Sequence, residues 1–163
     1  MKTTPTTPKT KAGLRARYLA LLLTALTAAF APQWASADGD VPFKGSAAGA
    51  IVGTTPGPEG VLLTVHAEGR ATHLGRFIRE EMVLLNPVTG TITGMVVFTA
   101  ANGDQLIAEA AGQFTSPTTV AGTYTFTGGT GRFENVVGEA DFSLSTPDGV
   151  HFTVEFEGSL GAN

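Results

Sequence analysis

The chain has 163 residues, of which 42% are hydrophobic and 15% charged, with no Cys and a formal net charge of −4. This length fits one ordinary domain, and the lack of Cys excludes disulfides, thiol nucleophiles, zinc fingers and iron–sulfur clusters. Beyond residue 37 the chain has five basic and 14 acidic residues. Such a balance repels phosphate backbones and anionic lipids, so we expect neither nucleic acid nor a membrane surface as a partner.

Residues 1–37 have the three-part pattern of a secretory signal peptide. A basic, acid-free stretch precedes an apolar run over residues 18–30, and Ala35 and Ala37 supply the small residues of a cleavage site. The apolar run is shorter than the about 20 residues that cross a bilayer. We therefore expect cleavage after Ala37, export to the periplasm or the medium, and a mature protein of residues 38–163 without a membrane anchor.

Beyond residue 37, hydrophobic and polar residues alternate with the period of two that is typical of half-buried strands. Near the end of the chain, Phe152, Val154 and Phe156 alternate with polar and charged residues. Turn residues separate the alternating runs, and Asn102-Gly103 between two such runs is a strong hairpin signal. The breaks predict eight strands, near residues 43–54, 60–75, 77–85, 90–101, 104–115, 119–127, 132–145 and 149–160.

Eight consecutive strands with short connections predict an all-β fold, an eight-stranded antiparallel up-and-down barrel formed by residues 38–163. A β-sandwich is the alternative. Glycines inside the strands, such as Gly69 and Gly122, favour the barrel, because tight coiling and close approach across the wall require residues without a side chain.

Three stretches carry a resemblance to a known family. They are Ala-Thr-His-Leu-Gly at residues 71–75, Ala-Asn-Gly-Asp at 101–104, and Gly-Gly-Thr-Gly-Arg-Phe at 128–133, with Gly138 after the last. Together they resemble the exported bacterial proteins of the allene oxide cyclase-like barrel family, whose fold plant dirigent proteins share. The third stretch is similar to a turn that dirigent proteins carry. The resemblance implies an eight-stranded barrel with an apolar lumen.

Plant members of this family cyclise a fatty-acid epoxide or steer the coupling of phenoxy radicals. The lumen cysteine of the cyclase has no counterpart here, since the chain has no Cys, and we carry over no catalytic residue. Three hypotheses stay open. The protein binds a small hydrophobic or aromatic ligand in its lumen, it is an isomerase or cyclase for a fatty-acid-derived or phenolic substrate, or it is a structural barrel with a filled interior. Because plant relatives are often oligomeric, the resemblance also implies a homo-oligomer.

His73 and Tyr124 are the candidate catalytic residues. His73 alternates onto the same face as Val65 and Phe77, so we expect it in the lumen, where an imidazole could act as a general acid or base. The alternative is a structural His bonded to a backbone carbonyl. The candidate ligand-binding residues are aromatic and either wall a cavity or fill the interior: Phe98, Phe114, Phe126 and Phe142.

Other charged residues indicate solvated surfaces. We expect Arg76 and Arg79 on the solvent side, where they pair with Glu80, Glu81 or Glu109.

A metal site would need ligands from several strands. His66 and Glu68 lie two apart on one strand face and could form half of such a site, but nothing in the spacing brings His151 to them as a third ligand. We expect no metal and no cofactor.

The glycine-rich stretch at residues 128–133 is expected to be a turn with positive φ at its glycines rather than a phosphate loop, because a strand and not a helix is expected after it. Phe133 or a neighbour is expected to plug one end of the barrel.

Overall fold

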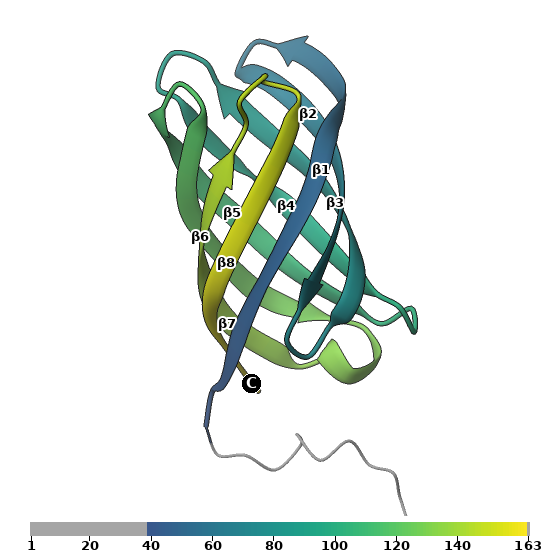
Figure 1. Cartoon of the computed structure of the whole chain (residues 1–163). Helices are drawn as coiled ribbons and strands as arrows, with labels where there is room; N and C mark the ends of the chain where they lie inside the picture. Colours follow the sequence, from purple (N-terminus) through teal and green to yellow (C-terminus); the bar gives the residue numbers. More distant parts are fainter. Residues whose placement is uncertain (1–38, 163) are drawn as a thin grey trace, which may run out of the picture. The chain divides into compact units, whose positions relative to one another are not determined.

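The structure, a computed structural model, describes residues 39–162. Each strand pairs antiparallel with the next, and β8 pairs with β1, so the strands close into an eight-stranded barrel (Figure 1). The predicted barrel is confirmed, while the predicted signal peptide lies outside the described residues. The strands are β1 (Val41–Gly57), β2 (Gly60–Ala71), β3 (Gly75–Asn86), β4 (Thr91–Ala100), β5 (Gln105–Ser116), β6 (Thr119–Gly129), β7 (Val136–Ser145) and β8 (His151–Ala162).

The two ends of the barrel differ. We call one the hairpin end, because the turns β1–β2, β3–β4, β5–β6 and β7–β8 lie there. The other, the termini end, holds the start of β1, the end of β8 and the turns β2–β3, β4–β5 and β6–β7 (Figure 1). This up-and-down order assigns every strand an inner and an outer face, as the period-two pattern predicts.

Glycines on the inner face make room for aromatic rings. A Cβ atom at Gly69 would lie 2.6 Å from the ring of Phe77, and one at Gly122 would lie 2.7 Å from the ring of Phe142. Each distance is too short for real atoms, so these positions require Gly while the rings occupy the lumen. The glycines predicted from the barrel geometry thus also make room for lumen side chains.

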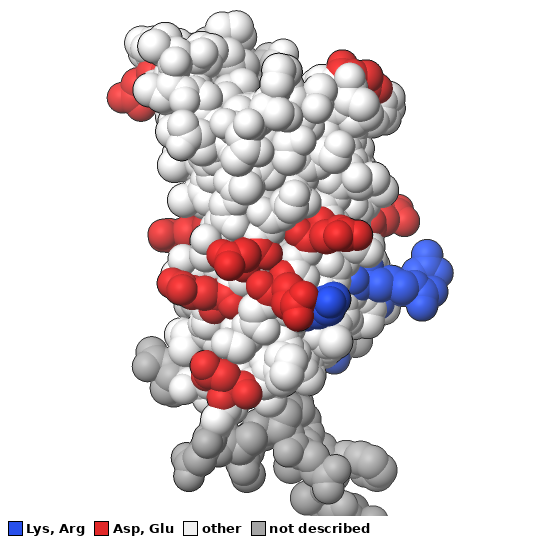
Figure 2. Space-filling model, turned by 60° about the vertical axis from the view of Figure 1, so that its left-hand side comes forward, with Lys and Arg blue, Asp and Glu red and all other residues white. Residues whose placement is uncertain are grey.

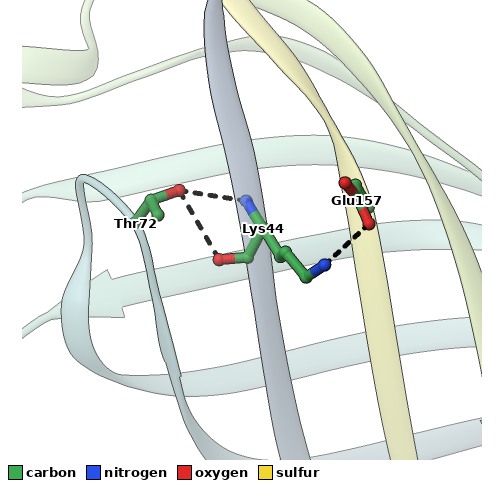
Figure 3. Close-up of polar contacts among 3 residues, drawn as sticks. All are labelled: Lys44, Thr72 and Glu157. Carbon is green, nitrogen blue, oxygen red and sulfur yellow. Dashed lines mark hydrogen bonds and ion pairs between the residues drawn. The ribbon is translucent and has the colours of Figure 1, made fainter.

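The β2–β3 connection differs from the prediction. The strand expected to reach residue 75 ends at Ala71, and residues 72–74 form a turn. Thr72 fastens this turn to β1, because its Oγ1 accepts a hydrogen bond from the backbone N–H of Lys44 at 3.0 Å (Figure 3). Lys44 in turn donates from Nζ to Glu157 on β8 at 2.9 Å. His73 follows Thr72 with φ of 64°, a left-handed conformation that residues other than Gly rarely adopt.

The β6–β7 connection contains the short 3₁₀ helix η1 (Gly131–Phe133), so β7 starts at Val136 and not at the predicted residue 132. Gly128 and Gly131 have positive φ, as the turn prediction requires. Phe133 is 1% exposed at the termini end, which confirms its predicted role as a plug.

Acidic side chains gather on the outer face of β7 and β8, where Asp141 is paired with Glu157 and Ser143 with Glu155. Figure 2 shows acidic groups in a band across one face of the barrel, with basic groups beside them. Glu155 and Glu157 are exposed, as their alternation with Phe152, Val154 and Phe156 predicts. Residues 39–162 contain no helix with the length and apolar character needed to span a bilayer.

Candidate functional site: a buried polar cluster beside a lumen cavity

Aromatic rings fill the half of the lumen nearer the termini end. Phe43 packs edge-on against Phe126 at 5.1 Å between ring centroids and stacks on Phe156 at 5.3 Å. Phe98 packs against Phe77 at 5.4 Å. All five rings are 4% exposed or less. This half is a packed core with no space for a ligand.

The other half of the lumen is not completely filled. It contains a cavity of about 70 Å³ toward the hairpin end. The deeper lining residues are buried, whereas those nearer the hairpin end are only half-buried, so the cavity reaches solvent at that end. These half-buried residues, which we call the rim, are Ile51, Leu63, Ile92, Phe114, Leu144 and Thr146. An apolar wall that opens at one end of an eight-stranded barrel is a common form of small-ligand site.

Arg79, Glu81 and Tyr124 form a polar cluster at the buried part of this cavity. Nη2 of Arg79 donates to Glu81 Oε2 at 2.8 Å and to the Tyr124 hydroxyl oxygen at 2.6 Å. The exposed fractions of the three residues are 2%, 7% and 0%. Charged side chains are rarely buried so completely unless an opposite charge offsets the cost of removing them from water.

Aromatic rings surround the guanidinium. Cζ of Arg79 lies 5.2 Å from the ring centroid of Tyr124, 5.8 Å from that of Phe98 and 5.9 Å from that of Phe152. The Tyr124 ring also stacks on Phe142 at 4.4 Å. These cation–π contacts offset part of the cost of burying the charge, and the rings restrict where the side chain can move.

Burial and the neighbouring charges decide the protonation of the cluster. Burial is the largest influence on Tyr124 and raises its pKa well above the usual value, although Arg79 opposes this. Burial alone would lower the pKa of Arg79, but Tyr124 and Glu81 together raise it above its usual value. At neutral pH the cluster therefore contains a protonated guanidinium and a neutral phenol.

The position of Arg79 and Glu81 corrects a sequence-based prediction. Both were expected on the solvent side, but both point into the lumen. The signal was present in the alternation of β3, where Arg79 and Glu81 share the parity of the buried Phe77 and Val83. The charge of these residues favours exposure, whereas the period of two places them inside.

The structure brings together only some of the predicted site residues. Tyr124, Phe114 and Phe142 line the cavity. Phe98 and Phe126 are buried, but they belong to the packed half and do not line it. The aromatic candidates therefore divide between the two predicted roles, since some wall the cavity and others fill the interior.

His73 does not lie in the lumen, so that expectation is wrong. It is exposed in the β2–β3 turn at the termini end, where Nε2 donates to the carbonyl oxygen of Pro42 at 3.2 Å. The backbone bond that was the alternative role of this His is the one observed. His73 borders a surface hollow of about 230 Å³ with Arg132 and Phe133, separate from the residues that line the lumen cavity.

The candidate metal ligands lie on the outer face. His66 and His151 are both paired with Ala50, from opposite sides of β1. Nδ1 of His151 lies 2.7 Å from Asp148 Oδ2 in the β7–β8 turn, and this hydrogen bond is the main reason that the pKa of Asp148 falls to about 2. Among residues 39–162, no three His, Asp or Glu side chains gather closely enough to hold a metal ion.

Comparison with known proteins gives no further assignment, because neither a protein-family model nor a curated protein sequence matches the chain.

Proposed function

We propose that the protein is an exported barrel that binds a small, largely apolar molecule in the half of its lumen nearer the hairpin end. The observation that carries this proposal is the cavity of about 70 Å³, which is walled by apolar side chains and has a buried polar cluster at one side. A structural barrel would need no cavity there, since the termini half demonstrates that this lumen can be filled with rings.

Export is part of the proposal and rests on the sequence of residues 1–37, with its basic stretch, apolar run and small residues before the cleavage site. The site of action would then be the periplasm or the medium.

The resemblance to the allene oxide cyclase-like family supports the same function. The closed eight-stranded barrel has the fold that this resemblance implies. Membership of the family is a proposal that rests on the three sequence stretches named above.

A second candidate function is an isomerase or cyclase that acts in the lumen. The observation that favours it is the presence of two groups that can exchange protons, Glu81 and Tyr124, among the cavity-lining residues. His73 has no part in this candidate, because it lies in an exposed turn. Turnover that is lost in Tyr124→Phe, in a protein that still binds its ligand, would distinguish the enzyme from a binding protein.

Native mass spectrometry of the protein purified from its own host tests the proposal. We expect a complex that carries one small ligand, which denaturing extraction releases. In Ala110→Leu, the added carbon atoms enter the cavity from a wall residue that is 2% exposed, so the ligand should be lost. The matched control is Ala111→Leu, at the exposed neighbour on the outer face of β5. A protein that stays free of ligand when it is offered lipids and phenolics would contradict the proposal.

A further inference from the structure

The polar cluster has unused hydrogen-bonding capacity. A guanidinium carries five N–H groups, and in Arg79 only those on Nη2 have acceptors. Nε and Nη1 are buried and have no hydrogen-bond partner. On Glu81, Oε2 accepts the bond from Arg79, whereas Oε1 accepts none within residues 39–162. Unused donors and an unused acceptor therefore occur in two side chains that both line the cavity.

Buried donors without acceptors are costly, and a native site usually supplies a partner for them. The chain itself supplies none within the described residues, because every other lining residue except Tyr124 and Thr146 is apolar. Arg79 is held by hydrogen bonds through one of its three nitrogens, which leaves Nε and Nη1 as the donors for an oxygen that enters the cavity. The partner that completes the cluster is thus a group that enters from outside.

The charge of the cluster restricts what that group can be. Arg79 and Glu81 are the two charged residues that line the cavity, and they neutralise each other. A carboxylate beside them would face Glu81, and an ammonium group would face Arg79, so each would add an unbalanced charge far from water. A neutral head group avoids this cost.

The hydrogen-bonding pattern of the cluster restricts the chemistry of this head group further. A ketone or ether oxygen can accept from Arg79 but offers nothing to Oε1 of Glu81. A hydroxyl group does both, because it accepts through its oxygen and donates its proton. The cavity of about 70 Å³ has the volume of roughly two water molecules in the liquid. It therefore accommodates a small head group and one or two carbon atoms, with the rest of the tail directed to the rim.

We propose that the lumen site recognises a neutral aliphatic alcohol, whose hydroxyl accepts a hydrogen bond from Arg79, donates one to Glu81 and leaves its apolar tail against the rim. This inference rests on the proposed function, because it names the chemistry of the ligand in that same cavity.

Four probes with one five-carbon chain test it: pentan-1-ol, pentanoate, n-pentylammonium and n-pentane. Each is titrated into the purified, ¹⁵N-labelled protein while the side-chain Nε–H signal of Arg79 is followed by NMR. We expect pentan-1-ol to shift that signal and to bind about tenfold or more tightly than pentanoate or n-pentylammonium. We expect n-pentane to bind with little effect on the signal, since it has no oxygen.

Glu81→Gln provides a second test that depends on charge. The substitution preserves shape but leaves the Arg79 charge unbalanced, so we expect the preference to reverse in favour of pentanoate. Glu80→Gln is the matched control, because Glu80 is the exposed neighbour on the outer face of β3, and it should keep the preference of the original protein. Should Glu81→Gln fail to fold, the four probes on the unmodified protein decide the matter alone.

Two results would overturn the inference, and they are distinguishable. If pentanoate binds as tightly as pentan-1-ol, or if pentan-1-ol and n-pentane bind equally without moving the Arg79 signal, the head-group assignment fails while lumen binding stands. If none of the four probes binds, both this inference and the proposed function fail.

Discussion

At the scale of single residues, the unusual feature of this barrel is the ion pair between Arg79 and Glu81 in its lumen. Desolvation of two charges offsets most of the energy that their attraction returns, so such a pair is a poor means of stabilising a fold. Apolar side chains in the same places would give a barrel of similar stability. What the pair adds is hydrogen-bonding capacity beside a cavity, and this is why we assign it a binding role.

Removal of one partner should be costly, because the other is left as an unpaired buried charge. We expect Glu81→Gln to lower the free energy of unfolding by about 3–5 kcal/mol in urea titrations. Glu80→Gln, at the exposed neighbouring position, should change it by less than about 0.5 kcal/mol. The double variant Arg79→Met, Glu81→Leu should recover most of the loss. Equal effects of Glu81→Gln and Glu80→Gln would mean that the pair is not buried.

Tyr124 offers a spectroscopic readout of the same cluster. In the mature protein that we expect from residue 38 onward, it is the only tyrosine. Burial raises its pKa above the ordinary value of 10.0, so the absorbance of tyrosinate should not appear in the folded protein as pH passes 10. After unfolding in urea, the residue should titrate near its ordinary pKa.

The sign of the linked stability change follows from this shift. Tyr124 holds its proton more tightly when folded, so its contribution to stability is complete below pH 10 and is lost as pH rises above it. Tyr124→Phe should lose this part of the pH dependence. Ordinary titration of Tyr124 in the folded protein would contradict its burial in the lumen.

At the scale of elements, the β2–β3 turn shows where a strand can end although the alternation of its sequence continues. Alternation continues through residues 71–75 in the sequence, and nothing in it marks a break except Gly75. In the structure the strand ends at Ala71, and in the turn that follows Thr72 bonds to Lys44 on β1, 28 positions earlier in the chain. A contact of that kind is tertiary, so local periodicity could not reveal that His73 leaves the lumen.

His73 has positive φ, a conformation that Asn adopts more readily than most residues and that β-branched residues avoid. We expect His73→Asn to change the free energy of unfolding by less than about 1 kcal/mol and His73→Val to lower it by about 1–2 kcal/mol. Ligand binding should be unchanged in both folded variants, since the residue does not line the cavity. Loss of binding in His73→Asn would restore His73 as a site candidate.

In strand β3, by contrast, the alternation of the sequence predicts correctly which residues are buried. Phe77, Arg79, Glu81 and Val83 share one parity, and all four are buried. The average preference of charged residues for water favours exposure of Arg79 and Glu81 instead of burial. Sequence patterns could therefore predict the number, order and approximate limits of the strands, whereas the polar cluster required knowledge that Tyr124 on β6 lies opposite Arg79.

At the scale of the whole barrel, the lumen divides into a packed half and a half that is not completely filled. The composition includes enough aromatic residues for a filled interior or for a walled cavity, but it does not show how these residues are distributed along the lumen. The distribution depends on which inward positions are glycine or alanine in neighbouring strands, because these decide where each ring can lie. Near the termini end the rings interdigitate, whereas Ala110, Val83 and Val120 beside the cavity are too short to close it.

This division predicts different costs for two Phe residues. Phe126→Ala, in the packed half, should lower the free energy of unfolding by about 3–5 kcal/mol, because it removes a ring that is 2% exposed from a filled core. Phe114→Ala at the half-buried rim should cost about 1–2 kcal/mol and should admit bulkier ligands. Denaturant titration compares the two, and equal costs would argue against this division of the lumen.

We expect the lumen nearer the hairpin end to be open to a small apolar guest, while the rest of the lumen is packed. A crystal structure of the protein under xenon pressure tests this expectation, because xenon binds against apolar walls such as those of the rim. We expect xenon between Phe114, Leu144 and the Arg79 cluster, and none among Phe43, Phe98 and Phe126. Absence of xenon, with Phe114 and Leu144 turned inward to fill the space, would contradict the account.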